Sequence, residues 1–321
     1  MSNTKWCLFQ GDNTSKEFKA LSAPPWRSRE NRIKSYRTFS DKIKKMVSAA
    51  LILRRPLLIT GSPGIGKSSL AEAVRHELQL GDEVLYWRIG TQSKFKDGLY
   101  SYDALSRLQD IQFEEKDSNG DLLSKKVENY LKLEALGTAF ASKKQRVVLI
   151  DEIDKSPIDL PNNLLHVFEE NQFEIPELKR LKDYPFTPFE NEDEYNIVNN
   201  GLVACDMETF PLIIMTSNGE RDFPAAFMRR CLHLEIKDPT SDELIKIVNS
   251  HFEQTDKTLD QERVKKIITS FLKLRDDEEN KAQLSTDQLL NAVYLLEQED
   301  SIDITEADNE MLDGIWRNLI G

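Results

Sequence analysis

The sequence predicts an α/β fold: a five-stranded parallel sheet covered by helices on both faces, followed by an all-helical C-terminal domain. Short apolar runs alternate with segments of helical periodicity through most of the chain, which is typical of parallel crossover units. A glycine-rich loop lies between the first apolar run and the helix after it. Beyond Asp238-Pro239 only helical periodicity remains.

Five apolar runs are the candidate strands, and their composition suits strands that are buried on both faces of a sheet. They span residues 57–60, 84–89, 147–150, 212–216 and 231–236. A helix is expected from Thr38 to a stop at Arg54-Arg55-Pro56, because proline cannot continue a helix. Further helices are expected from Lys67 onward and over 160–170.

The 321 residues divide into three parts. Residues 1–37 have little periodic pattern and are expected to form an extended N-terminal arm. Residues 38–237 form the α/β domain, and residues 238–321 form the helical domain, which we call the lid. Two interruptions of the α/β domain, near 110–130 and 171–211, are too long for plain loops, so they are expected to be inserts with small elements of their own.

Composition excludes several classes of protein. No apolar run approaches the roughly 18 residues of a membrane-spanning helix, and the first residues lack the apolar core of a secretory signal. Three cysteines without a CxxC spacing indicate reduced, structural thiols and a cytoplasmic location. Four scattered histidines give no zinc-binding pattern.

Charge is distributed unevenly along the chain. The net charge is −12, with +9 in residues 1–55 and −10 in residues 237–321. An acidic total argues against nucleic acid as a partner, because phosphate contacts need a concentrated positive face. The basic start could contact an acidic partner or the acidic end of a neighbouring copy, and two ordinarily solvated faces are the simpler interpretation.

The strongest motif is a match to GxxxxGK[ST] between the first strand and the next helix. Glycines allow backbone N–H groups to surround phosphate oxygens, and the helix that follows presents its positive N-terminus. Lys67 is expected to reach the β and γ phosphates, and the Ser68 hydroxyl to ligate Mg²⁺. The motif predicts the three-layer sandwich of the P-loop NTPases and a nucleotide-binding loop made of Gly61, Ser62, Pro63, Gly64, Ile65, Gly66, Lys67, Ser68 and Ser69.

Polar residues follow two further strands at their carboxyl ends, the edge where open α/β sheets bind ligands. Asp151 is expected to hold the water shell of the magnesium ion and Glu152 to polarise the attacking water. Asn218 could position that water without adding charge beside the γ-phosphate. The adjacent Asp154 and Lys155 are expected to form a local salt bridge.

Arg229 and Arg230 directly precede the fifth strand. In isolation they would be surface cations. A phosphoryl-transfer transition state, however, is stabilised by a guanidinium, often from a neighbouring subunit. Either arginine is therefore a candidate for that role.

The ordered set of motifs resembles the AAA+ ATPases, and most closely their MoxR-type group in the helix-2-insert clade. That likeness covers about residues 38–236 and rests on Asp151-Glu-Ile-Asp-Lys-Ser-Pro, Leu164-Leu-His-Val-Phe-Glu-Glu170 and Phe223-Pro-Ala-Ala-Phe-Met-Arg-Arg230. The resemblance implies a ring, usually a hexamer, with ATP between subunits and an arginine reaching across. It also implies that the two inserts are an insert in the second helix and a hairpin before the first sensor strand.

One position departs from this family. Its members usually carry a sensor arginine at the start of a lid helix, where this chain reads Leu284-Ser-Thr-Asp-Gln288. Either another cation such as Lys281 substitutes for it, or the lid does not contact the γ-phosphate.

The motifs therefore predict an ATPase with ATP and Mg²⁺ as ligands. The resemblance implies in addition that it forms a homo-oligomeric ring and couples ATP hydrolysis to remodelling or activation of a partner protein. Two alternatives stay open. One is a nucleotide-gated interaction switch with little turnover. The other is a DNA-associated motor subunit, which the basic residues 1–55 keep in consideration.

Overall fold

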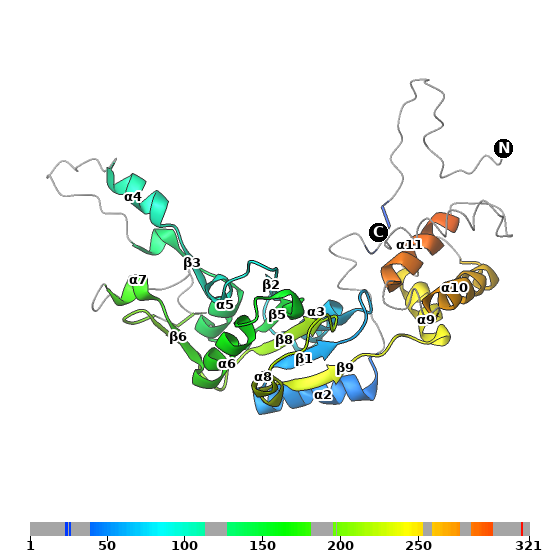
Figure 1. Ribbon diagram of the computed structural model, residues 1–321, viewed down its shortest axis with the longest axis horizontal. Helices are drawn as coiled ribbons and strands as arrows, with labels where there is room; N and C mark the ends of the chain where they lie inside the picture. Colours follow the sequence, from blue (N-terminus) through cyan, green and yellow to red (C-terminus); the bar gives the residue numbers. More distant parts are fainter. Residues whose placement is uncertain are drawn as a thin grey trace, which may run out of the picture. The chain divides into compact units, whose positions relative to one another are not determined.

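The computed structural model (Figure 1) describes residues 39–112, 127–180, 195, 196, 198–252, 259–276 and 284–297, together with Ala23, Pro24, Trp26 and Trp316. Most of the N-terminal arm, the middle parts of both inserts and Lys281 lie outside these residues.

The predicted five-stranded parallel sheet is confirmed. Its strand order is β2-β5-β8-β1-β9, and each neighbouring pair is parallel. The strands match the five apolar runs to within two residues at each end: β1 (Leu57–Thr60), β2 (Leu85–Arg88), β5 (Val147–Asp151), β8 (Leu212–Ser217) and β9 (Leu232–Glu235). Every residue of β5 and β8 is buried, as expected for central strands of a covered sheet.

Helices flank the sheet. α2 (Asp41–Leu53) packs against β1 and β9, and α5 (Ala135–Ala141) packs against β2 and β5. The side chain of Ser40 caps α2 by accepting the N–H of Ile43, and the helix ends at Arg54 in a left-handed conformation. The other helices of this part are α3 (Lys67–Leu78), α6 (Leu160–Glu170) and α8 (Ala225–Arg230).

Small elements lie at both inserts. The first insert is bounded by an antiparallel pair, β3 (Tyr100–Tyr102) and β4 (Leu131–Leu133), which lies outside residues 110–130, and the helix α4 (Ala104–Gln112) runs into it. The second contains the antiparallel pair β6 (Gln172–Glu174) and β7 (Leu202–Ala204), with the short helix α7 (Pro176–Lys179).

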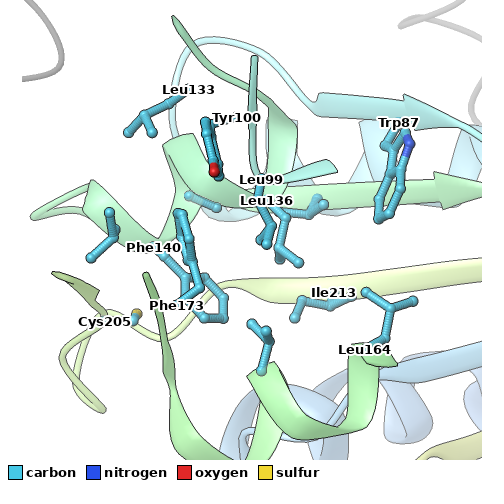
Figure 2. Close-up of a cluster of buried hydrophobic side chains, with 14 of the residues drawn as sticks. Trp87, Leu99, Tyr100, Leu133, Leu136, Phe140, Leu164, Phe173, Cys205 and Ile213 are labelled. Atoms are coloured by element: carbon cyan, nitrogen blue, oxygen red, sulfur yellow. The ribbon is translucent and has the colours of Figure 1, made fainter. Parts of the chain in front are cut away.

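The two inserts pack together around one apolar cluster (Figure 2). Tyr100 of β3 stacks on Phe173 of β6 with ring centroids 6.5 Å apart, and Phe140 of α5 lies 6.3 Å from Phe173. Glu177 of α7 accepts hydrogen bonds from Lys96 Nζ at 2.9 Å and from the Tyr100 hydroxyl at 2.8 Å. The inserts are thus one continuous structure although they are distant in sequence.

Gly137 in α5 allows this packing, and its replacement by alanine is expected to destabilise the protein. A Cβ at Gly137 would collide with the backbone carbonyl of Leu99, which has no flexible end to move away. Overpacking of this kind costs about 1–3 kcal/mol. Urea unfolding should show this loss for Gly137→Ala but not for Gly90→Ala, where a Cβ meets nothing within 4 Å. Equal stability of the two variants would contradict the packing described.

The chain forms two compact units. One comprises residues 39–60 and 70–235, and the other comprises residues 1–38, 61–69 and 236–321. The second unit contains α9 (Ser241–Phe252), α10 (Gln261–Arg275) and α11 (Thr286–Leu296), whose apolar faces share one core. Among the described residues, no helix has the length and apolarity needed to cross a membrane.

Trp26 of the N-terminal arm belongs to the core of this helical unit. Its ring lies 5.6 Å from that of Tyr294, 5.7 Å from Phe252 and 6.0 Å from His251. Trp26 is 7% exposed, so its side chain is part of the core of these helices.

Cys205 and Cys231 are buried free thiols. Burial raises the pKa of Cys205 to about 11 and the pKa of Cys231 to about 12. Both groups therefore stay as unreactive thiols at neutral pH, which agrees with a structural role.

Candidate nucleotide-binding site

The glycine-rich loop connects the carboxyl end of β1 to the start of α3. Three of its residues, Gly61, Gly64 and Gly66, have positive φ values of 152°, 72° and 85°. Such conformations favour glycine, and they allow consecutive backbone N–H groups to turn toward a bound anion.

Lys67 is the first residue of α3 and is only 7% exposed. Its Nζ donates hydrogen bonds to the carbonyl oxygens of Gly61, at 2.6 Å, and Ser62, at 2.9 Å. The loop therefore fixes a positive charge at a helix N-terminus, which is the local environment that phosphate groups prefer.

Asp151 and Glu152 lie at the carboxyl end of β5. Asp151 is 8% exposed, and its carboxylate accepts hydrogen bonds from two hydroxyl groups, those of Thr216 on β8 and Tyr86 on β2. The Tyr86 oxygen lies 2.5 Å from Asp151 Oδ2. Burial and the hydrogen bond to Asp151 raise the pKa of Tyr86, so the phenol remains a protonated donor at neutral pH.

Glu152 has a left-handed backbone conformation, with φ at 59°. Non-glycine residues adopt this conformation at a cost of about 1–3 kcal/mol, so the surrounding structure must hold it in place. The side chain of Glu152 pairs with Lys155, with Oε1 and Nζ 2.8 Å apart. This hydrogen bond raises the pKa of Lys155 and keeps its ammonium group charged.

The predicted salt bridge between Asp154 and Lys155 is wrong, because Lys155 pairs with Glu152 instead. Asp154 is 5% exposed, and its Oδ2 accepts the backbone N–H groups of Asn218 at 2.8 Å and Glu220 at 3.2 Å. The buried carboxylate thus fixes the loop after β8 to the turn after β5. The error arose because neighbours in sequence are poor guides to partners in a turn.

Sheet register brings the ends of three strands to one edge. Thr60 of β1 pairs with Ser217 of β8, and Ile150 of β5 pairs with Met215 of β8. Asn218 therefore follows the strand that separates the phosphate-loop strand from the acidic strand. The structure thus places Asp151, Glu152 and Asn218 at the edge from which the phosphate loop leaves β1.

Arg229 and Arg230 end α8 and are both exposed. Arg230 forms an ion pair with Glu169 of α6 through its Nε, and its Nη1 donates to the carbonyl of Ala226 at 3.3 Å. Arg229 Nε donates to the carbonyl of Ala225 at 3.2 Å. Contacts within the chain therefore hold both arginines at the end of this helix.

Sequence reasoning missed Tyr86 as part of the site, and it assigned Thr216 no role of its own. Thr216 stands two residues before Asn218 and could have been found from that spacing. Tyr86 has no sequence signal, because its contact with Asp151 depends on β2 lying beside β5. In the lid, α11 begins with Ser285 as its N-cap in a capping box with Gln288, in agreement with the absence of an arginine there.

A parallel sheet with a phosphate loop after one strand and acids after another defines the P-loop class of nucleotide-binding folds. The chain belongs to the AAA domain family, dynein-related subfamily, whose family model matches residues 56–231, more than half of the sequence.

Two solved structures are similar to this chain at low identity. A point variant of RuvB from Thermotoga maritima has 13% identity and a TM-score of 0.45, with 90% of this chain and 69% of that chain covered. A putative ATPase from Cytophaga hutchinsonii has 12% identity and a TM-score of 0.39, with 88% and 83% covered. Comparison with curated protein sequences gives no match.

Proposed function

We propose that this protein binds ATP with Mg²⁺ and hydrolyses it, in a ring of identical subunits that remodels or activates a partner protein. Within its family we propose membership of the MoxR-type group, on the residue patterns around Asp151, Leu164 and Phe223. The observation that carries the ATPase proposal is the sheet register: β1, which leads into the phosphate loop, and β5 and β8, which lead to the acid pair and Asn218, end at the same edge of the sheet.

The residues present fit both ligands. The positive-φ glycines and the buried Lys67 suit a polyphosphate. Asp151 and the Ser68 hydroxyl offer the oxygen donors that Mg²⁺ prefers, and Mg²⁺ would neutralise charge on the β and γ phosphate oxygens.

The remaining requirements for hydrolysis are a water molecule oriented toward the γ-phosphorus and a group that accepts its proton. Asn218, fixed through its backbone by Asp154, would orient a water molecule toward the γ-phosphorus. Glu152 would accept the proton as the water oxygen forms its bond to phosphorus and the bond to the β–γ bridging oxygen breaks. Lys155 could hold the Glu152 side chain until nucleotide binds, since the two are paired here.

The first test is direct. We expect the purified protein to release inorganic phosphate from ATP in Mg²⁺ but not in EDTA, and light scattering to show a larger assembly with ATP than without nucleotide. A protein that binds Mg-ATP without releasing phosphate would support the switch alternative. A monomer with full activity at every concentration would contradict the ring.

Arg230 is proposed to contact the γ-phosphate of a neighbouring subunit. A guanidinium has five donors, so Nε can keep Glu169 while the outer edge binds phosphate. Arg230→Ala is expected to lower kcat by about 10³-fold, with ATP affinity unchanged. Arg229→Ala is the matched variant, and we expect a smaller loss, because among the described residues the Arg229 guanidinium contacts only its own helix, at Ala225. An equal or larger loss for Arg229→Ala would reverse the assignment.

A further inference from the structure

Two hydroxyl groups hold the metal-binding carboxylate of Asp151 from both sides. Thr216 of β8 donates to Oδ1, and Tyr86 of β2 donates to Oδ2. β2 and β8 are the two strands that flank β5 in the sheet. Each hydroxyl therefore reaches Asp151 from an adjacent strand, so the sheet itself sets the orientation of the carboxylate.

Thr216 also contacts Glu152, the residue directly after β5. Its Oγ1 accepts the backbone N–H of Glu152 at 3.0 Å. A hydroxyl can donate once and accept at the same time, so the hydrogen bonds run in one direction, from Glu152 N–H to Thr216 and from Thr216 to Asp151. Such chains strengthen each of their bonds. The same contact gives the backbone N–H of Glu152 a hydrogen-bond acceptor, in a residue that has the left-handed conformation.

We propose that Thr216 and Tyr86 are positioning residues that fix Asp151 for magnesium, and that Thr216 also fixes Glu152 relative to that metal. This inference rests on the proposed function, because it concerns the same Mg-ATP site. A carboxylate accepts about four hydrogen bonds, so Asp151 can hold both hydroxyls and still accept from a magnesium-bound water. Residues that orient a metal ligand typically contribute 10–100-fold to metal affinity or activity, so we expect an effect of about that size.

The roles of the two residues differ. Tyr86 contacts Asp151, so removing its hydroxyl should reduce the gain in ATP affinity that Mg²⁺ provides. Thr216 contacts both Asp151 and Glu152, so removing its hydroxyl should reduce that gain and also lower kcat. The two residues can therefore be distinguished by experiment.

The test uses Thr216→Val, which keeps the shape of the side chain and removes the hydroxyl, and Thr216→Ser, which restores the hydroxyl. Binding of a fluorescent ATP analogue is measured by anisotropy in Mg²⁺ and in EDTA. We expect Thr216→Val to lose about 10-fold or more in affinity in Mg²⁺, with affinity in EDTA unchanged and kcat also lowered. Thr216→Ser should recover most of both.

Tyr86→Phe provides a second variant, because Tyr86 is half exposed at a sheet edge and its loss should not impair folding. We expect weaker binding in Mg²⁺ with a near-normal kcat at saturating Mg²⁺. Tyr102→Phe is the matched control and should behave as wild type. Among the described residues, the Tyr102 hydroxyl contacts only Arg107, whose Nη1 donates to it at 2.7 Å.

The outcomes separate the two proposals. If wild-type protein fails to bind the analogue, the proposed function fails. If wild-type protein binds it and its affinity depends on Mg²⁺, but Thr216→Val and Tyr86→Phe show the same dependence, the positioning role is refuted and the proposed function stands. A Thr216→Ser variant as impaired as Thr216→Val would also refute a role for the hydroxyl.

Discussion

Replacing Lys67 with alanine is expected to weaken ATP binding strongly and to lower turnover. The ammonium is buried and held by the carbonyls of Gly61 and Ser62 at the start of α3, where it would meet the phosphate oxygens. Removing one partner of a buried pair of opposite charges, here the Lys67 ammonium and a phosphate group, costs about 2–5 kcal/mol. That corresponds to a loss of ATP affinity between about 30-fold and several thousand-fold.

Titration calorimetry with ATP and Mg²⁺ measures this loss. Lys265→Ala is the matched control, since Lys265 lies on the exposed side of α10 and pairs only with Glu262 among the described residues. We expect Lys265→Ala to bind ATP as wild type does, and thermal unfolding to show that both variants are folded. Unchanged affinity in Lys67→Ala would remove the basis for a nucleotide site in this loop.

Glu152→Gln is expected to stop hydrolysis while ATP still binds. The amide keeps the size of the side chain and can still contact Lys155, but it cannot accept the proton of the attacking water. A positioned general base contributes about 10²–10⁴-fold, so kcat should fall by that factor. Phosphate release under single-turnover conditions measures the chemical step, and calorimetry measures the binding.

Glu174→Gln is the control for this second variant. Glu174 also pairs with a lysine, Lys179, at 2.8 Å, but it lies in the second insert. We expect its kcat to equal that of wild type. If Glu152→Gln retains partner activation in full, ATP binding alone drives the response, and the switch alternative replaces the motor.

Much of the fold was predictable because its signals are local. A buried parallel strand reads as a short apolar run, so all five strands of the sheet could be located. The phosphate loop could be found because glycines at Gly61, Gly64 and Gly66 are required by its backbone. Asp151, Glu152 and Asn218 followed from their places directly after predicted strands.

The remainder depends on neighbours in space that the sequence does not place side by side. Tyr86 is 65 positions from Asp151, and only the strand order brings them together. The hydrogen bonds of Glu177 with Lys96 and Tyr100 likewise join residues that are far apart in sequence. Two carboxylates, those of Glu152 and Asp154, lie near Lys155 along the chain. The turn after β5 directs Asp154 to the backbone of Asn218, so Lys155 pairs with Glu152.

The burial of Trp26 among α9 and α11 has a consequence for the order of events during biosynthesis. Trp26 leaves the ribosome long before the helices that surround it, and domains generally fold as they emerge. Residues 39–235 can form the sheet and its flanking helices in that interval. The indole can be buried only after α11 has been translated, so the core shared by α9 and α11 is completed after the sheet.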